Sequence, residues 1–353
     1  MYAPPYLVLL RLNQRVSVET DGLGLSGVRE LVESMQCDKR GTEPEIVFVN
    51  YLSRSGSTLL CKLLDRYKGI SVGIEAGFPG AITKLIPDEY REINEDGLLA
   101  RYLDELYQDV RFRDWKVDQQ RLFSRLRRTG YPLTFRDILL ACLEEYFGHG
   151  RVEIYIHKAG FYIDILDDVR SIFGDCVKNI FIIRDPRAIY SSQNNATCIY
   201  SGRLMGSCLA NFVYQYKKRV QIVKADKSNT LLCIKYEDLV KDTDQVMEKV
   251  LSFLGIPHAE LEDGDYADRI PDGQKQLHVN VGDAPNINSF DKWKAKLRAH
   301  EVLFIQRKLS SEMRSLGYKP VCVDGLSATG FFLYMILELK YIYTRILRFA
   351  RFV

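Results

Sequence analysis

Apolar residues along the chain follow two alternating spacings. The continuous apolar run from Ile46 to Val49 is typical of a buried strand, and helical spacing follows at Leu59, Leu60, Leu63 and Leu64. The same alternation predicts further strands at 70–73, 152–156, 178–183 and 231–235, and helices at 57–67, 162–173, 204–225 and 244–254. Repeated β-α-β steps of this kind predict an α/β fold with a central parallel β-sheet flanked by helices.

A stretch of different character interrupts this alternation at about 87–148. Helical periodicity dominates it, at Leu98, Leu99, Tyr102, Leu103 and Leu106 and again at Ile138, Leu139, Leu143 and Tyr146. We therefore predict a helical insertion that covers the sheet edge. Its basic stretch, from Arg111 to Arg128, has two readings. It could bind an anionic glycan or acidic peptide as acceptor. It could also be a solvated helix face, which is what a run of charged residues most often forms.

The two ends of the chain differ from the core at 45–320. Residues 1–44 form an N-terminal extension with a predicted helix at 26–35, and residues 258–290 form a long polar loop. The segment 321–353 ends in an aromatic and basic helix, in which Glu338, Lys340 and Arg345 interrupt any apolar span of about 20 residues. This C-terminal helix is expected either to dock on the domain or on a second subunit as a homodimer, or to contact an anionic membrane surface.

The loop after the first strand has the composition of a phosphate-binding loop. Arg54, Ser55, Gly56, Ser57 and Thr58 lead directly into the helix, whose first N–H groups lack internal partners and favour an anion. A loop for ATP or GTP would place Lys before the Ser/Thr, and here no Lys is present. Arg54 supplies a positive charge instead, so the P-loop-like segment can hold a phosphate without a metal. The alternative is an ordinary turn that caps the helix.

A second candidate anion site follows the strand at 178–183. Arg184 stands at the strand end, Pro186 suits a first helical position, and Ser192 lies about two turns into the following helix. An Arg and a Ser so spaced can face one anion. The alternative is a strand-end ion pair between Arg184 and Asp185.

Composition narrows the classes of partner. The 353 residues carry a net charge of +3 with a pI of about 8.3, which is too mild to argue for nucleic acid. The eight cysteines show no CxxC or Cys/His cluster, so no metal site is predicted. No secretory signal is recognisable at the start, so we expect a cytoplasmic protein that can contact a membrane surface from that side. A location in the Golgi lumen would require an N-terminal membrane anchor outside this sequence.

The two anion segments, RSGSTLL and IFIIRDPRAIYSS, resemble those of sulfotransferases that use 3′-phosphoadenosine 5′-phosphosulfate (PAPS). The similarity is closest to the Golgi-type carbohydrate and tyrosylprotein branch, and it runs from about Glu45 to Pro320 through IKYEDL, SFDKWK and LGYKP. The RKGxxG loop of the cytosolic branch is absent, and Ala196 stands where tyrosylprotein enzymes carry a further Arg.

The resemblance implies a role for each candidate residue. Glu75 and Lys158 match the catalytic glutamate and lysine of the tyrosylprotein branch. Arg54 and the backbone of residues 55–58 would hold the 5′-phosphosulfate, Arg184 and Ser192 the 3′-phosphate, and Tyr236 the adenine. We expect PAPS as co-substrate, no metal, and an acceptor hydroxyl on a carbohydrate. The alternatives are a tyrosylprotein sulfotransferase, a P-loop small-molecule kinase and a non-catalytic nucleotide-binding scaffold.

Overall fold

The computed structural model describes residues 44–76, 78, 92–148, 152–198, 202–206, 208–264, 266–271, 290–323 and 325–350. The chain divides into two compact units, 1–43 and 44–353, and all described residues belong to the second. The predicted helix at 26–35 lies outside the described residues, and so does His278, a second candidate base in the polar loop at 258–290.

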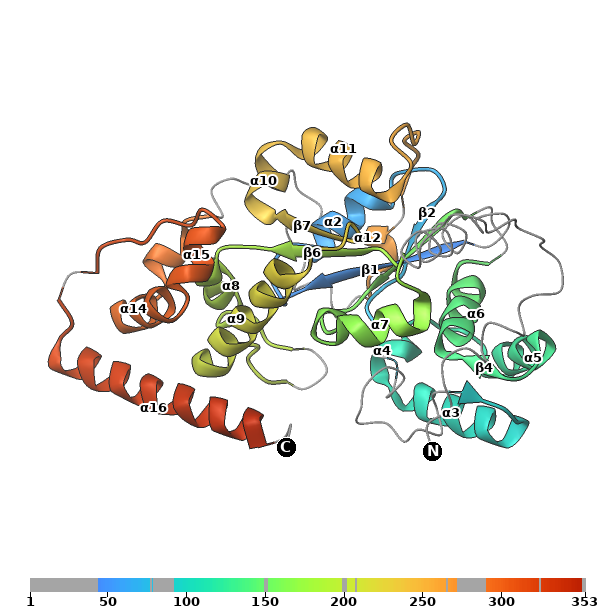
Figure 1. The fold of residues 1–353 in the computed structure, drawn as a ribbon, viewed down its shortest axis with the longest axis horizontal. Coiled ribbons are helices and arrows are strands. Elements are labelled where there is room, and N and C mark those ends of the chain that lie inside the picture. Colours follow the sequence, from blue (N-terminus) through green and yellow to red (C-terminus); the bar gives the residue numbers. More distant parts are fainter. Residues whose placement is uncertain are drawn as a thin grey trace, which may run out of the picture. The chain divides into compact units, whose positions relative to one another are not determined.

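Five parallel strands form the central sheet of the second unit (Figure 1). In spatial order they are β2 (Ile70–Val72), β5 (Ile154–Lys158), β1 (Glu45–Tyr51), β6 (Asn179–Ile183) and β7 (Leu231–Lys235). β1, β5 and β6 are buried along almost their whole length, as expected of strands covered on both faces. The predicted α/β fold with a central parallel sheet is confirmed.

Alternate residues of β6 enter two different hydrophobic cores. Ile180 and Ile182 belong to a core shared with α2 and α11, whereas Phe181 and Ile183 belong to a core shared with α9. Successive side chains of a strand point to opposite faces of a sheet, so helices must cover both faces. The principal covering helices are α2 (Ser57–Leu64), α7 (Leu166–Phe173), α8 (Pro186–Gln193), α9 (Leu209–Ala225), α10 (Tyr236–Lys241) and α11 (Thr243–Leu254).

The stretch at 92–148 is helical, as the periodicity predicted. It begins with β3 (Glu92–Ile93), which pairs antiparallel with β4 (Leu133–Thr134). Its helices are α3 (Asp96–Gln108), α4 (Val110–Arg113), α5 (Gln119–Thr129) and α6 (Phe135–Phe147). α6 begins at a reciprocal capping box between Thr134 and Asp137, which satisfies two backbone donors.

Several element bounds differ from the sequence prediction. β5 ends at Lys158, so this lysine is the last residue of the strand and does not lie beyond it. α2 ends at Leu64, three residues early, because the Asp65 carboxylate accepts hydrogen bonds from the backbone of Val72 and Tyr266. α9 begins at Leu209, and Leu204 instead forms an isolated bridge with Thr197. The predicted helix at 162–173 starts with a 3-10 turn, Tyr162–Ile165.

The C-terminal part of the unit is helical as well. It comprises α12 (Tyr266–Arg269), the 3-10 turn Lys292–Ala295, α14 (Ala299–Lys308), α15 (Ser310–Ser315) and α16 (Ala328–Ala350). α16 packs against α9 and α14, and Figure 1 shows it as the long red helix. Among the described residues, no helix combines the length and apolar character that crossing a membrane requires.

Candidate functional site

The loop between β1 and α2 has a strained backbone. Arg54 adopts φ 75° and Gly56 φ 96°, and both angles lie in the left-handed region that residues other than glycine rarely adopt. The Ser55 N–H donates to the Leu52 carbonyl over 3.0 Å, which closes the turn. Strain of this kind persists where the surroundings fix it, commonly at ligand sites. The turn sets the N-terminus of α2, with Ser57 and Thr58 buried, at the carboxyl end of β1.

The second anion segment lies against this loop. Arg54 Nε donates to Ser192 Oγ over 3.1 Å, and Arg184 Nη1 donates to the Arg54 carbonyl over 3.4 Å. Gln193, at the end of α8, also donates to the carbonyl of Ser53 over 2.9 Å. The structure therefore brings the two predicted phosphate segments together into one site.

Tyr236 closes one side of the loop. The Arg184 guanidinium lies 4.3 Å from the centre of the Tyr236 ring, a cation-π contact. The same ring covers Gly56 so closely that a Cβ at position 56 would lie 2.2 Å from Tyr236 Cδ2. Three predicted cofactor residues are thus stacked, and glycine is needed at position 56 for both its backbone angle and the close approach.

Two positive charges influence one another at this site. Burial lowers the pKa of Arg54, and the nearby charge of Arg184 lowers it further. Like charges held close together disfavour the charged form, and an anion bound between them would relieve that repulsion. The electrostatics of the site therefore favour a negatively charged ligand.

Lys158 adds a third cation from the neighbouring strand. Its side chain is buried, donates from Nζ to Thr58 Oγ1 over 3.2 Å, and lies 5.3 Å from the centre of the Tyr51 ring. The parallel pairing of β5 with β1, which sets Lys158 opposite Val49, brings it to the same end of the sheet as the loop. Lys158 therefore lies at the first turn of α2.

Glu75 lies on the segment that follows β2 and lines a cavity together with Tyr51. Its Oε1 forms an ion pair with Arg111 Nη1 at 3.0 Å. Burial raises the pKa of Tyr51, and the Glu75 carboxylate raises it further. Glu75 and Arg111 both line a cavity of about 350 Å³ together with Tyr51, Gln193 and residues of α9. A candidate base thus faces a cavity that adjoins the anion site.

The insertion's basic stretch divides between two environments. Arg121 and Arg125 pair with Glu145 within the insertion, and Arg127 pairs with Asp96. Arg111 instead reaches the cavity through Glu75. These pairs give Arg121, Arg125 and Arg127 partners within the insertion, whereas Arg111 lines the cavity of the candidate site.

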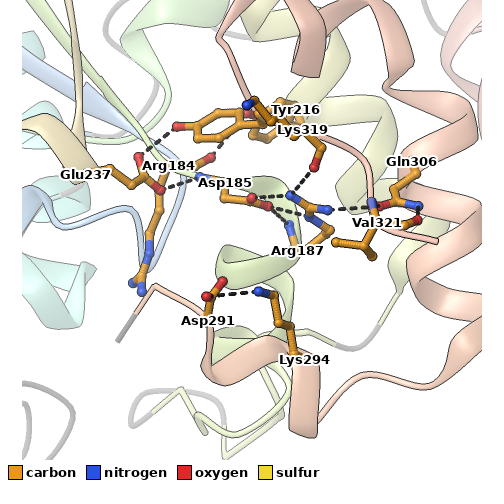
Figure 2. Close-up of polar contacts among 11 residues, drawn as sticks. Arg184, Asp185, Arg187, Tyr216, Glu237, Asp291, Lys294, Gln306, Lys319 and Val321 are labelled. Carbon is orange, nitrogen blue, oxygen red and sulfur yellow. Dashed lines mark hydrogen bonds and ion pairs between the residues drawn. The ribbon is translucent and has the colours of Figure 1, made fainter. Parts of the chain in front are cut away.

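Sequence analysis missed the network that supports Arg184. Asp185 forms its ion pair with Arg187 (Nη2 to Oδ2, 2.7 Å), and Arg187 also donates to Gln306 and to the carbonyl of Lys319. Figure 2 shows the Arg184 side chain running away from this pair. The alternative interpretation, an ion pair between Arg184 and Asp185, is therefore wrong, because the Asp185 carboxylate pairs with Arg187.

A second missed group is Glu237, whose buried carboxylate accepts hydrogen bonds at the carboxyl end of β6. It accepts from the Asp185 N–H at 2.9 Å and from the Tyr318 hydroxyl at 2.8 Å, and the Tyr216 hydroxyl donates to the Arg184 carbonyl at 3.1 Å (Figure 2). Glu237 lies in IKYEDL and Tyr318 in LGYKP, so the motifs were visible in the sequence. Only the fold shows that they fix the backbone from which Arg184 extends.

Within the described ranges, no cluster of three or more His, Cys, Asp or Glu side chains is arranged to hold a metal ion. All ten predicted site residues are among the described residues and lie around the loop or the adjoining cavity.

Comparison with known proteins gives one family and several distant structures. The family model of the sulfotransferase family matches residues 44–260. A sulfotransferase domain from the curacin biosynthetic pathway shares 18% identity, covering 80% of this chain and 100% of its own, with a TM-score of 0.49. The domain from the Synechococcus PCC 7002 olefin synthase shares 19%, covering 79% and 97%, also at 0.49. A mouse sulfotransferase complexed with PAP shares 14%, covering 77% and 86%, at 0.41. No curated protein sequence matches the chain.

Proposed function

The chain belongs to the sulfotransferase family, and we propose that it transfers a sulfuryl group from PAPS to a hydroxyl group of a carbohydrate. The observation that carries the proposal is the union of two anion segments, through Arg54 and Ser192, at the N-terminus of α2. A donor with phosphate groups at both ends of its ribose needs two such adjoining sites, whereas ATP needs one continuous triphosphate site.

The loop residues fit such a donor. Arg54, Lys158 and Arg184 supply positive charge within one small region. The Ser55 hydroxyl is fully buried and has no hydrogen-bond partner among the described residues, which suits a donor to a bound phosphate oxygen. Arg54 and the N–H groups of residues 55–58 would hold the 5′-phosphosulfate, and Arg184 and Ser192 the 3′-phosphate. Tyr236 would face the adenosine.

The cavity supports a carbohydrate as the acceptor. It is lined by the rings of Phe161 and Phe212 and by the amides of Gln193, Asn211 and Gln215. Rings can pack on the C–H face of a sugar, and amides both donate to and accept from hydroxyl groups. The Golgi-type carbohydrate branch that the motifs resemble is consistent with this acceptor class.

The geometry supports a single displacement. Glu75 takes the proton as the acceptor oxygen attacks sulfur, and the bond between sulfur and the bridging oxygen breaks. Lys158 neutralises the negative charge that builds on the departing bisphosphate. Arg111 fixes the orientation of the Glu75 carboxylate through the 3.0 Å ion pair. No covalent enzyme intermediate is required, since positioning and charge stabilisation supply the catalysis.

Two measurements test this proposal. Isothermal titration should detect PAP binding without magnesium. ATP binding that depends on magnesium would instead favour a small-molecule kinase. The absence of any nucleotide binding would favour a non-catalytic scaffold. Incubation with labelled PAPS and a panel of glycans, tyrosine peptides and small alcohols should then label a glycan. Label on the peptides alone would replace the carbohydrate acceptor by a tyrosylprotein one.

A further inference from the structure

α16 has one face that belongs to the domain. Tyr334 and Tyr341 are buried in the core that α9 and α14 share with this helix, and both rings pack edge-on against Phe304. Glu338 pairs with Lys308 of α14 at 2.5 Å and accepts from the Tyr334 hydroxyl at 2.6 Å. These contacts fix the rotation of the helix about its own axis, and so fix which residues face outward.

The opposite face of α16 is a continuous apolar strip. Eight large hydrophobic side chains on it are each at least 42% exposed: Phe331, Phe332, Met335, Leu339, Ile342, Tyr343, Ile346 and Leu347. At about 100° per residue, these positions cover a sector of roughly 160° that contains no polar residue from Phe331 to Leu347. A soluble monomer rarely exposes so long an apolar surface, so the strip calls for a partner.

The charges of α16 identify that partner. Exposed Lys340 lies at one border of the apolar strip, and at the other border lie Glu338 and, slightly further round the helix, exposed Arg345. Glu338, the single acidic residue of the helix, is paired with Lys308 of α14, and its side chain is only 20% exposed. Burial raises the pKa of Glu338, but the Lys308 and Tyr334 hydrogen bonds outweigh it and hold this pKa below its usual value. The acidic group at the border of the strip is thus neutralised by Lys308, which leaves Lys340 and Arg345 as the exposed charges beside the apolar side chains.

We propose that the outward face of α16 docks the protein on an anionic membrane surface, with the helix lying in the plane of the interface. The apolar strip would enter the boundary between headgroups and acyl chains, while Lys340 and Arg345 contact acidic headgroups. An isologous contact with a second copy fits less well. It would set the same cationic borders of two helices against each other, and Glu338, the one acidic residue of α16, is already paired with Lys308.

Membrane docking through α16 would also orient the candidate acceptor cavity. Arg348 Nη2 donates to Asn211 Oδ1 over 3.3 Å, and Asn211 lines that cavity. The cavity wall would then lie one side chain away from the membrane-bound helix. A glycan carried on a membrane lipid would then be the acceptor that reaches the cavity. This consequence rests on the proposed function, since it takes the cavity to be the acceptor site.

Vesicle co-sedimentation of the full chain tests the proposal without reference to activity. The protein should pellet with vesicles of phosphatidylcholine plus phosphatidylglycerol, and binding should fall with phosphatidylcholine alone or with added salt. The double variant Lys340→Glu, Arg345→Glu should bind at least about 25-fold less, because each lost cation costs about fivefold and each new carboxylate is repelled by the anionic surface. Leu339→Ser with Ile342→Ser should also lose at least about tenfold through lost apolar burial.

A matched variant controls for overall charge. Lys241→Glu with Lys249→Glu makes the same charge change at exposed positions of α10 and α11, and it should bind vesicles as wild type does. Wild type that stays in the supernatant with anionic vesicles overturns the proposal. So does a dimer, measured by light scattering, that dissociates in the Leu339→Ser, Ile342→Ser variant and does not bind vesicles. PAP titration of the same preparations reports on the sulfotransferase proposal separately.

Discussion

Arg54 Nε donates a hydrogen bond to the hydroxyl of Ser192 over 3.1 Å, although 138 positions separate the two residues in the chain. The contact joins the loop after β1 to helix α8 after β6, and these two strands are neighbours in the sheet. Because both strands end at the same edge, two anion segments that are remote in sequence act as one site.

Arg184→Ala and Ser192→Ala should both weaken PAP binding without unfolding the protein. A charge-assisted hydrogen bond contributes on the order of 1.5 to 3 kcal/mol and a neutral one about 1 kcal/mol, so the Arg variant should lose more affinity. Isothermal titration with PAP measures both. Ser191→Ala, on the same helix, is the matched control and should bind normally.

Adenosine 5′-phosphosulfate, which lacks the 3′-phosphate, identifies the phosphate concerned. It should bind wild type and the Arg184→Ala variant about equally. A variant that still prefers PAPS as strongly as wild type does would show that the 3′-phosphate site lies elsewhere.

Gly56→Ala should damage nucleotide binding as well as stability. A left-handed backbone costs a residue with a Cβ about 1 to 2 kcal/mol, and here the methyl would also lie 2.2 Å from the Tyr236 ring. Gly202→Ala is the control for a positive φ without a steric contact, because Gly202 has φ 64° and nothing within 4 Å of its Cβ position. Both variants should melt earlier, and Gly56→Ala alone should lose PAP affinity. If Gly56→Ala bound PAP as tightly as the control variant does, the contact between Gly56 and Tyr236 would have no part in nucleotide binding.

Glu75→Gln should abolish most turnover while PAP affinity changes little. The amide keeps the reach of the carboxylate but cannot accept the acceptor proton, and losing a general base typically costs about 10²- to 10⁴-fold in rate. Labelled-sulfate transfer and PAP titration on one preparation give both values.

Arg111→Met provides the control for the Glu75 ion pair. It removes the pair but leaves the carboxylate, so its turnover should fall far less than that of Glu75→Gln. Near-normal turnover in Glu75→Gln would remove Glu75 from the mechanism and make His278 the next base to test.

Arg187→Met should destabilise the fold strongly. It leaves the Asp185 carboxylate buried without its cation, which typically costs about 3 to 5 kcal/mol. Lys68→Met breaks an exposed pair with Glu260, where both side chains are more than two-thirds exposed, and should cost less than about 1 kcal/mol. Urea denaturation compares the two variants. Similar losses would show that Arg187 does not anchor the strand end.

His157 should make the fold less stable in mild acid. It is fully buried next to Tyr162, Phe78 and Trp115, and burial lowers its pKa to about 3. Below about pH 6.5 the His157 imidazole binds a proton in the unfolded chain, whereas in the folded chain it stays neutral down to about pH 3. The free energy of unfolding is therefore unaffected by this group above pH 6.5 and decreases as the pH falls from 6.5 toward 3.

The His157→Phe variant isolates this effect. Between pH 7.5 and pH 5, wild type should lose about 2 kcal/mol more unfolding free energy than His157→Phe loses. Urea midpoints at the two pH values measure the difference. Identical pH dependence in both proteins would show that His157 does not titrate between the folded and unfolded states.

The sequence by itself determined the elements and the chemistry of the loop. The run from Ile46 to Val49 and the helical spacing after Thr58 are local patterns, and local steric and solvation preferences suffice to convert them into a strand and a helix. The same holds for the strand before Arg184 and for the helical stretch at 92–148. Residue types alone also indicated an anion site without the lysine of an NTPase loop.

Only the tertiary structure decided which side chains meet. The ion pairs of Asp185 with Arg187 and of Glu75 with Arg111, and the stacking of Tyr236 on Gly56, depend on strand order, strand register and the exact ends of helices. A shift of two residues in β5 moved Lys158 from a loop into a buried strand. Such contacts join distant segments, and their energies depend on burial and on competing partners, which no local pattern in the sequence records.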